Sequence, residues 1–195
     1  MPELILHHYD GSPFGEKIRR IIAFKGVPFR SVRIPPIMPG AELGCLTGAY
    51  RRTPVLQVGS DIYCDTRCIT AYIERRFSSP SLYPSGSHLV CDLMSLWTEP
   101  RMFVAMAPVR FRSRDDVPGL FGRSVTRRDF FQDRQQFMLG ALDVSRLPDL
   151  WPSAYDQTCI FLQVLERALR QSDFLAGREP SLADFSAHHL VWWLE

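Results

Sequence analysis

The sequence lacks the features that are typical of nucleic-acid-binding, membrane-spanning and secreted proteins. Only Lys17 and Lys25 among its 23 basic residues are lysines, and the net charge is +2 over 195 residues, so no strong field draws the chain to nucleic acid or to an anionic membrane. It has no RNP-type or zinc-finger spacing. No apolar run approaches the roughly 18 residues of a spanning helix, and Met1–Leu4 does not begin a secretory signal. We therefore expect no nucleic acid and no membrane among its partners.

Cysteine is also sparse. The five cysteines are an odd number without a C-x-x-C pair, which favours free thiols in a reducing cytoplasm over a disulfide framework. Cys64 and Cys68 lie four positions apart, but no other Cys or His stands at metal-ligand spacing, so we expect no metal site. With 46% hydrophobic and 23% charged residues, the chain can bury a core as one large domain or two small ones.

The first third of the chain alternates between strand and helix patterns. Residues 4–9 form a short apolar run that ends in the turn residues Asp10-Gly11-Ser12-Pro13. Residues 16–25 have a helical period with Arg19 and Arg20 pointing outward, and residues 29–34 alternate as a strand. The apolar side of the helix is formed by Ile18, Ile21 and Ile22. The sequence thus predicts a first β-α-β unit.

A second unit of two strands and a helix follows an irregular stretch. Residues 35–48 are rich in proline and glycine and are expected to hold at most one short helix. Residues 53–58 and 62–64 predict a β-hairpin, and residues 67–77 predict a helix. The order βαβ-ββα is typical of a thioredoxin-like domain, which we place at residues 1–78.

The rest of the chain contains helix patterns only. Residues 79–88, rich in serine and proline, predict a linker. Helices are expected at 88–106, with a bend near Pro100, and at 127–142 and 156–169; residues 112–123 predict a polar loop. We therefore expect an all-helical domain over residues 89–195.

The last predicted helix has a clear N-capping signal and no signal that would end it. Ser181 is a candidate N-cap, and Asp184, three residues later, can reach back to it as in a capping box. The helix pattern then continues to Leu194 and Glu195 with no C-cap glycine. This end predicts a C-terminally truncated chain.

Four short segments, in this order, carry a resemblance to a known family. They are Ser12-Pro13-Phe14-Gly15, Thr53-Pro54 ahead of Val55-Leu56, Asp65-Thr66 at a helix start, and Gly177-Arg178-Glu179-Pro180-Ser181-Leu182-Ala183-Asp184. Together they resemble the glutathione S-transferase superfamily, in particular its serine-type theta-, zeta- and omega-like bacterial members. The resemblance covers nearly the whole chain and implies the same two-domain architecture.

The resemblance implies a glutathione site in the first domain. The backbone of Thr53, turned by a cis Pro54, would pair with the cysteinyl part of glutathione like an added strand. Asp65 would meet the γ-glutamyl ammonium, and Thr66, at a helix N-terminus, would meet the α-carboxylate. A plain N-cap is the alternative for Asp65-Thr66, and capping is compatible with binding. Phe14 is included in the site through its place in the Ser12-Pro13-Phe14-Gly15 turn.

The loop before Pro54 departs from the family's usual Asn-Pro-x-Gly-Lys-Val-Pro segment. Here it reads Gly48-Ala49-Tyr50-Arg51-Arg52-Thr53-Pro54. Arg51 or Arg52 offers a cation for the glycyl carboxylate of glutathione, and we assign the contact to Arg52. A solvated arginine pair is the alternative.

Ser12 is our candidate for the group that stabilises the glutathione thiolate. Its hydroxyl and the N-terminus of the following helix would together lower the pKa of the thiol from about 8.5 by about 2. Tyr9 is a rival donor, His8 is expected to line the cleft or to be satisfied within the fold, and Ser12 can also serve as a helix cap only. No cysteine occupies this turn, so thioether formation is favoured over thiol-disulfide exchange.

These features predict a glutathione transferase acting on a small hydrophobic electrophile. Glutathione is its co-substrate, and the resemblance implies a homodimer in the cytoplasm with a role in detoxification. Two alternatives stay open. One is a glutathione-dependent isomerase or dehalogenase, and the other is a non-catalytic transferase-like interaction module.

Overall fold

The computed structural model describes residues 2–37, 41–48, 50–112, 125–137 and 146–195. The described residues fall into two compact units, the first within residues 1–80 and 118–133 and the second within residues 81–117 and 134–195. The domain limits of 1–78 and 89–195, with a linker at 79–88, remain a proposal.

The first unit is built on a four-stranded mixed sheet. Its strands are β1 (Leu4–His8), β2 (Phe29–Arg33), β3 (Val55–Val58) and β4 (Asp61–Cys64), in the order β2-β1-β3-β4. β1 is parallel to β2 and antiparallel to β3, and β3 is antiparallel to β4. This arrangement confirms the thioredoxin-like topology.

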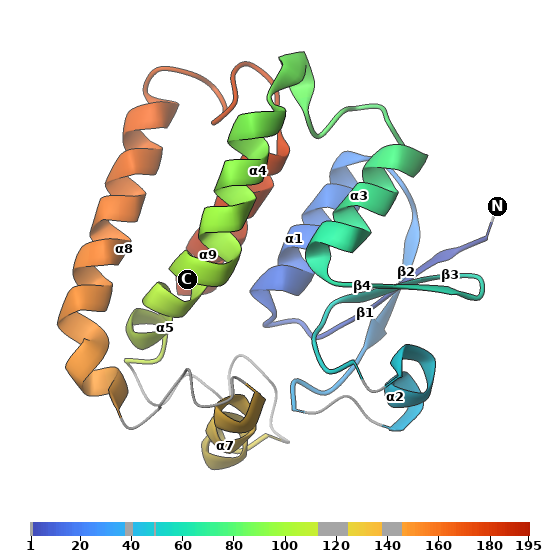
Figure 1. Cartoon of the computed structure of the whole chain (residues 1–195), viewed down its shortest axis with the longest axis horizontal. Coiled ribbons are helices and arrows are strands. Elements are labelled where there is room, and N and C mark those ends of the chain that lie inside the picture. Colours follow the sequence, from blue (N-terminus) through green and yellow to red (C-terminus); the bar gives the residue numbers. More distant parts are fainter. Residues whose placement is uncertain (1, 38–40, 49, 113–124, 138–145) are drawn as a thin grey trace. The chain divides into compact units, whose positions relative to one another are not determined.

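Two helices lie side by side on one face of this sheet, and a third lies on the other face (Figure 1). The pair consists of α1 (Pro13–Phe24) and α3 (Thr66–Arg76), and the third is α2 (Ala41–Thr47). Five isoleucines of the pair have no exposed surface: Ile18, Ile21, Ile22, Ile69 and Ile73. α1 begins three residues before the predicted helix, because Pro13 has a suitable φ and needs no hydrogen bond at the first helical position.

A buried charge ties the ends of these two helices together. The side chain of Lys25, which follows α1, has 0% exposure, and its ammonium group forms an ion pair with Glu74 of α3. The same ammonium group donates to the carbonyl oxygen of Pro80. Lys25 therefore holds the chain that leaves α3 against the end of α1.

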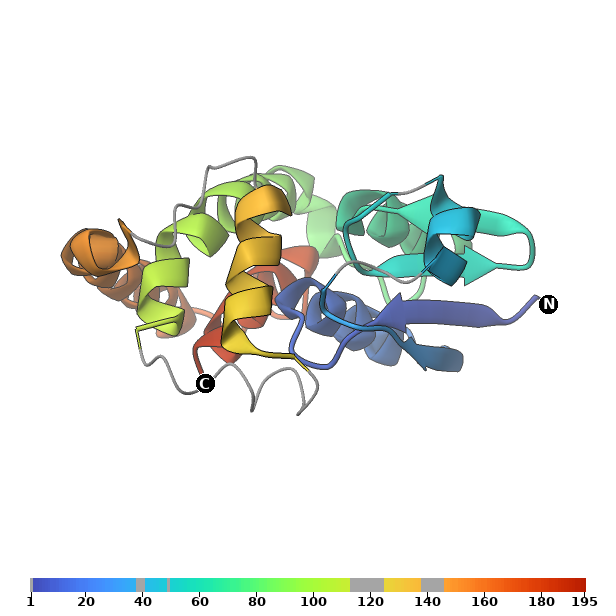
Figure 2. The same cartoon turned by 90° about the horizontal axis from the view of Figure 1, so that it is seen from below.

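The second unit is helical, as expected. α4 (His88–Trp97) continues through a π-helical stretch, Thr98–Met102, into α5 (Phe103–Arg110). The predicted helix therefore extends to Arg110, and Pro100 lies within its π-helical stretch. α4 packs against α9 (Leu182–Leu194), and α5 packs against α8 (Leu147–Leu169), as Figure 2 shows from a second side.

Two of the predicted helices have different limits in the structure. α8 begins nine residues before the predicted start. Pro148 lies in its first turn, where backbone N–H groups have no helical partner, and Pro152 removes one hydrogen bond from a helix of 23 residues. α7 (Arg127–Phe137) starts as predicted. The rest of that prediction, 138–142, and the predicted loop, apart from Arg112, lie outside the described residues.

The predicted cap of the last helix is confirmed. One carboxylate oxygen of Asp184 accepts from the backbone nitrogen of Ser181 at 2.9 Å and from its hydroxyl at 2.7 Å. The other oxygen accepts from the backbone nitrogen of Leu175 at 2.8 Å. Asp184 thereby fixes both the start of α9 and the loop before it. Of the helices that the structure describes, none combines the length and the apolar character needed to cross a bilayer.

Candidate functional site

Three segments of the first unit meet at one edge of its sheet. β1 and β4 both run antiparallel to β3, and His7 and Cys64 are both register partners of Val55. The carboxyl ends of β1 and β4 and the start of β3 therefore share an edge. Three predicted segments lie there: Tyr9 to Ser12 after β1, Thr53-Pro54 before β3, and Asp65-Thr66 after β4.

Ser12 is the N-cap of α1. Its hydroxyl oxygen accepts a hydrogen bond from the backbone nitrogen of Gly15 at 3.0 Å. Its own backbone nitrogen donates to the carbonyl oxygen of Tyr9 at 3.2 Å. Because the hydroxyl oxygen is an acceptor in the cap, its own proton remains available for a second hydrogen bond. The side chain is only 1% exposed, so that bond would form in a largely water-excluded place.

Asp65 has an unusual backbone at the head of α3. Its φ is 76° and its ψ is 136°, a combination that a residue with a Cβ atom rarely adopts. Its carboxylate accepts from the backbone nitrogen of Arg67 at 2.9 Å, and the residue is exposed. Thr66, the first residue of α3, is buried. The N-cap, which was the alternative role for Asp65-Thr66, is therefore present, and strain of this kind is often found at binding sites.

The Thr53-Pro54 peptide bond is cis, as expected. Pro54 is buried and Thr53 is half-buried directly before β3. Tyr9 and Phe14, one on each side of Ser12, are both half-buried. All the predicted residues named so far thus belong to the shared edge or to the first turn of α1.

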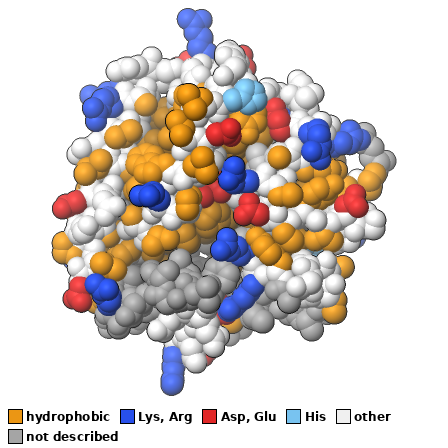
Figure 3. All heavy atoms as spheres, in the orientation of Figure 1, with side chains coloured by type: hydrophobic (Ala, Val, Ile, Leu, Met, Phe, Trp, Pro, Cys, Tyr) orange, Lys and Arg blue, Asp and Glu red, His pale blue; other side chains and the backbone are white. Residues whose placement is uncertain are grey.

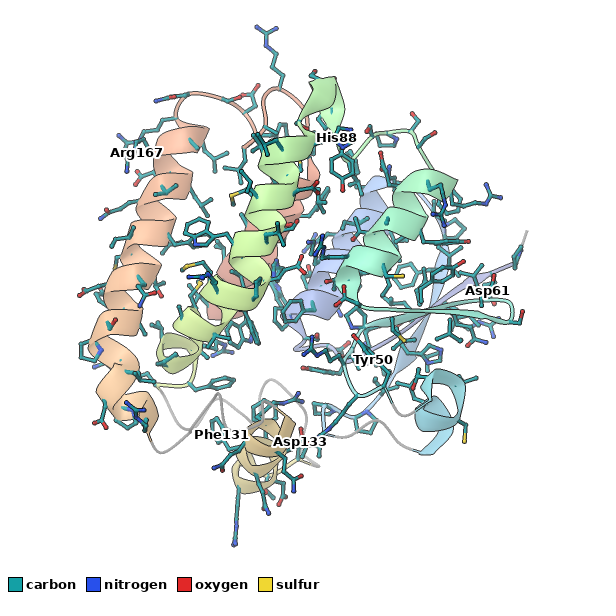
Figure 4. All side chains as sticks on the ribbon, in the orientation of Figure 1. Tyr50, Asp61, His88, Phe131, Asp133 and Arg167 are labelled. Carbon is teal, nitrogen blue, oxygen red and sulfur yellow. The ribbon has the colours of Figure 1, made fainter. Side chains whose placement is uncertain are left out.

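The two arginines before Thr53 have different surroundings. The guanidinium of Arg51 donates to the carboxylate of Asp133, a buried residue of α7 in the same unit. Figure 4 labels Asp133 on α7 and Tyr50 on the loop that precedes Arg51. Arg52 is exposed. Of the two candidate cations, Arg51 forms an ion pair with Asp133, and Arg52 is the more exposed side chain.

Both helices of the pair begin at this edge. A helix N-terminus carries a partial positive charge of about half a unit and several backbone N–H groups without helical partners. Ser12 heads α1 and Asp65 heads α3, so two such ends lie at the same edge of the sheet. An anionic ligand with two charged groups would be stabilised at both.

A buried polar network behind Ser12 was not predicted. Nη1 of Arg19 donates to Nδ1 of His8 at 2.8 Å, so the ring carries its proton on Nε2 and donates to the hydroxyl of Ser31 at 2.7 Å. Burial lowers the pKa of His8, and the charge of Arg19 lowers it further. Of the two expectations for His8, the structure supports the one in which it is satisfied within the fold.

The same network corrects the prediction that Arg19 points outward. Its side chain is 21% exposed and pairs with the carboxylate of Glu16 at 2.5 Å. Burial favours a raised pKa for Glu16, but hydrogen bonds from Arg19 and Arg20 outweigh it and hold the pKa below its usual value. The spacing of Glu16 and Arg19, three apart on a helix, is the sequence signal that could have indicated this pair.

Tyr50 is a second residue near the edge that the sequence did not indicate. Burial raises the pKa of its hydroxyl, and the negative charge of Asp65 raises it further. The group therefore stays protonated at neutral pH and can donate a hydrogen bond near Asp65. In the part of the chain that the structure describes, no three His, Cys, Asp or Glu side chains gather in a way that could hold a metal ion.

Comparisons with known proteins agree with this geometry. The family model described as glutathione S-transferase, N-terminal domain, matches residues 6–81. A solved GST-like protein from Pseudomonas syringae is 35% identical, with a TM-score of 0.69 and 99% of this chain covered. The chain belongs to the glutathione S-transferase superfamily. No curated protein matches it in sequence.

Two further superfamily structures are more distant and show the fold alone. Glutathione S-transferase III in its apo form is 20% identical, with a TM-score of 0.67, and the match covers 98% of this chain and 81% of that one. A theta class glutathione S-transferase from Xanthomonas axonopodis pv. citri, solved with glutathione bound, is 18% identical with a TM-score of 0.66, and the match covers 95% of this chain and 79% of that one. The chain spans 58% of the length of the Pseudomonas syringae protein, so it accounts for only part of that longer relative.

Proposed function

We propose that this superfamily member is a glutathione transferase that joins the sulfur of glutathione to a small hydrophobic electrophile. The observation that carries the proposal is the meeting of Ser12 and Asp65-Thr66 at one sheet edge, each at the N-terminus of a helix. Glutathione has two carboxylates, one ammonium group and a thiol that must become a thiolate. The edge offers a complementary group for each of them.

The γ-glutamyl end of glutathione is assigned to the start of α3. The exposed carboxylate of Asp65 would meet the ammonium group, and Thr66, the first residue of α3, would bind the α-carboxylate through its hydroxyl and N–H. The strained backbone of Asp65 supports this assignment, because a positive φ at a residue other than glycine is often found at binding sites. The backbone of Thr53 would bind the cysteinyl part, and Arg52 would bind the glycyl carboxylate.

The thiol end is assigned to Ser12. The hydroxyl donates to the sulfur, while the N-terminus of α1 adds about 0.3–1 kcal/mol of stabilisation for a negative charge. His8 does not serve as the base, because Nδ1 is occupied by Arg19 and Nε2 donates to Ser31. The thiol proton therefore leaves to solvent. Tyr9 remains the alternative donor, and Phe14, in the first turn of α1, is the proposed apolar neighbour of the thiol.

The chemical step is a nucleophilic substitution or addition. In a substitution, the thiolate attacks an electrophilic carbon, the carbon–sulfur bond forms, and the leaving group departs with its bonding electrons. In an addition to an activated double bond, the π electrons move to the neighbouring carbon as the carbon–sulfur bond forms, and that carbon then takes a proton from solvent. A lower thiol pKa raises the thiolate fraction but lowers intrinsic nucleophilicity, with a Brønsted coefficient of about 0.4–0.5. Correct placement of the electrophile must therefore supply most of the rate enhancement.

One observation favours a non-catalytic interaction module instead. Ser12 is 1% exposed and already caps α1, as it would in a protein that never binds glutathione. The glutathione-dependent isomerase or dehalogenase is the second catalytic alternative. It shares the glutathione site and differs in the fate of the sulfur.

Glutathione binding and product analysis together separate these functions. Calorimetry with glutathione comes first, comparing the wild type with Asp65→Asn and with Asp61→Asn, an exposed carboxylate at the start of β4. We expect binding that is weakened by the first substitution only. Incubation with alkyl halides, aryl halides and activated alkenes should then yield thioethers. Conversion of the substrate with recovery of free glutathione or its disulfide would favour the isomerase or dehalogenase, and the absence of binding would favour the interaction module.

We further propose that the protein is a cytoplasmic homodimer with a role in detoxification. Four apolar side chains of α4 are exposed, and this exposure supports an oligomer: Leu89, Val90, Leu93 and Leu96. Figure 3 shows further apolar groups spread over the face on which α4 lies. Light scattering should give twice the chain mass of 22.4 kDa. Replacing Leu89 and Leu93 by glutamate should give the single mass.

A further inference from the structure

A single guanidinium group joins the three pieces of chain that surround Ser12. Nε and Nη2 of Arg19 donate to one carboxylate oxygen of Glu16 at 2.9 and 2.5 Å. Nη1 donates to His8, the last residue of β1, at 2.8 Å. Nη2 also donates to the backbone carbonyl of Asp10 at 3.2 Å. Arg19 thus contacts the end of β1, the turn that leads to Ser12, and the first turn of α1.

The partners of Arg19 are themselves fixed. His8 donates through Nε2 to Ser31 on β2 at 2.7 Å, so its ring is held from both sides. Glu16 uses its carboxylate for Arg19 and its backbone nitrogen for the carbonyl of Ser12, at 2.8 Å. The network therefore brackets Ser12 between a strand and a helix, and the turn between them has little freedom.

Close packing around Gly15 leaves little room for Ser12 to move. A Cβ atom added at Gly15 would lie 3.2 Å from Cβ of Ser12 and 3.4 Å from Cβ of His8. Distances of 3.4 Å or less are tighter than ordinary contacts between carbon atoms. A residue larger than glycine at position 15 would therefore crowd both Ser12 and His8, and Arg19 holds His8 through its ring.

We propose that Arg19 is a positioning residue for the thiolate, because it fixes the turn from which the Ser12 hydroxyl meets the glutathione sulfur. This inference rests on the proposed function for its catalytic consequence. It does not concern the γ-glutamyl end, which is assigned to Asp65 and Thr66 on a different helix. Loss of Arg19 should therefore affect catalysis more than glutathione binding.

The chain offers a matched control for this role. Arg20 forms an ion pair with the other carboxylate oxygen of Glu16 at 2.5 Å. Its side chain is 55% exposed, and neither His8 nor Asp10 is among its hydrogen-bond partners in the described part of the chain. Arg19→Gln and Arg20→Gln each remove one positive charge that pairs with the carboxylate of Glu16. Only Arg19→Gln also removes the contacts with His8 and Asp10 that hold the turn.

Hydrogen exchange tests whether Arg19 holds the turn before Ser12, and kinetics tests whether that turn positions Ser12 for catalysis. In Arg19→Gln, amides of residues 9–15 should exchange at least tenfold faster than in the wild type, with no such change in Arg20→Gln. At pH 6.5 the turnover number kcat should fall about threefold in Arg19→Gln, the loss expected when the Ser12 hydroxyl no longer meets the thiolate. KM for glutathione should stay at its wild-type value. The pKa of the bound glutathione thiol should rise toward its value in water.

Each other outcome overturns part of the inference. Equal exchange in the two variants would show that Arg19 does not hold the turn. Faster exchange with unchanged kcat and thiol pKa would show that the turn does not position Ser12. If the wild type neither binds nor consumes glutathione, the proposed function fails, while the exchange comparison still shows whether Arg19 holds the turn. Should Arg19→Gln not fold, Arg19→Lys, which cannot reach all three partners with one ammonium group, replaces it with the same expectations.

Discussion

Replacing Ser12 by alanine separates a capping role from a catalytic one. The substitution removes the acceptor for the backbone nitrogen of Gly15, and loss of an N-cap costs about 1 kcal/mol of folding free energy. If the hydroxyl also donates to the thiolate, a hydrogen bond to a charged group worth about 1.5–3 kcal/mol is lost as well. The pKa of the bound glutathione thiol then rises by about 1.5.

This change in thiol pKa predicts a crossing of the two pH–rate profiles. With a wild-type thiol pKa of about 6.5, half of the bound glutathione is thiolate at pH 6.5, against about 3% in the variant. The more basic thiolate of the variant is intrinsically about fivefold more nucleophilic. The variant should therefore be about threefold slower at pH 6.5 and about fourfold faster at pH 9, where both thiols are ionised.

The assay is the initial rate of thioether formation at saturating glutathione across this pH range, after subtraction of the uncatalysed reaction. Ser181→Ala is the matched control, because Ser181 is a buried N-cap of α9 and its loss should leave the profile unchanged. Parallel profiles for Ser12→Ala and the wild type, together with the expected loss of stability, would refute the catalytic role and leave Ser12 as a cap.

Three further predictions concern the site and its support. Asp65→Gly relieves a positive φ of 76°, so the free energy of unfolding by denaturant should rise by about 1 kcal/mol while calorimetry shows loss of glutathione binding. Gly15→Ala crowds Ser12 at 3.2 Å, so kcat at pH 6.5 should fall about threefold, as for loss of the Ser12 hydroxyl, and the gain in helix propensity should keep the melting temperature near that of the wild type. Lys25→Met removes the buried ammonium group that pairs with the half-buried carboxylate of Glu74, and the free energy of unfolding should fall by about 3 kcal/mol in chemical denaturation.

Control variants are available for two of these three substitutions, and each prediction has a result that would contradict it. Asp61→Gly should leave glutathione binding intact, and a rise in affinity in Asp65→Gly would contradict the assigned contact. Arg30→Met breaks an exposed ion pair and should cost less than about 1 kcal/mol; an equal loss in Lys25→Met would mean that the buried pair adds nothing. Wild-type kcat in Gly15→Ala would show that the turn tolerates displacement.

Short-range signals in the sequence predicted the fold well. The hydrophobic period of residues 16–25, the strand patterns and the turn residues between them are set by local geometry, and the sheet confirms their order. The cap formed by Ser181 and Asp184 spans three residues, and the structure shows its hydrogen bonds. Such features depend on neighbours in the chain and can therefore be predicted without the tertiary structure.

Contacts between distant residues were the part that the sequence could not predict. Arg51 pairs with Asp133, 82 positions away, and no local pattern indicates which of two adjacent arginines does so. Arg19 was expected to face solvent because it lies outside the apolar side of α1, yet His8 and Asp10 supply polar partners there. Tyr50 likewise depends on the tertiary position of Asp65.

The most direct test of the account is the titration of glutathione while it is bound to the wild-type protein. The ultraviolet absorbance of the thiolate, followed as a function of pH with the protein in excess, gives the pKa of the bound thiol. The account predicts an inflection about 2 below the ordinary thiol value of about 8.5. An inflection at the ordinary value, or no glutathione bound at all, would contradict thiolate formation at Ser12.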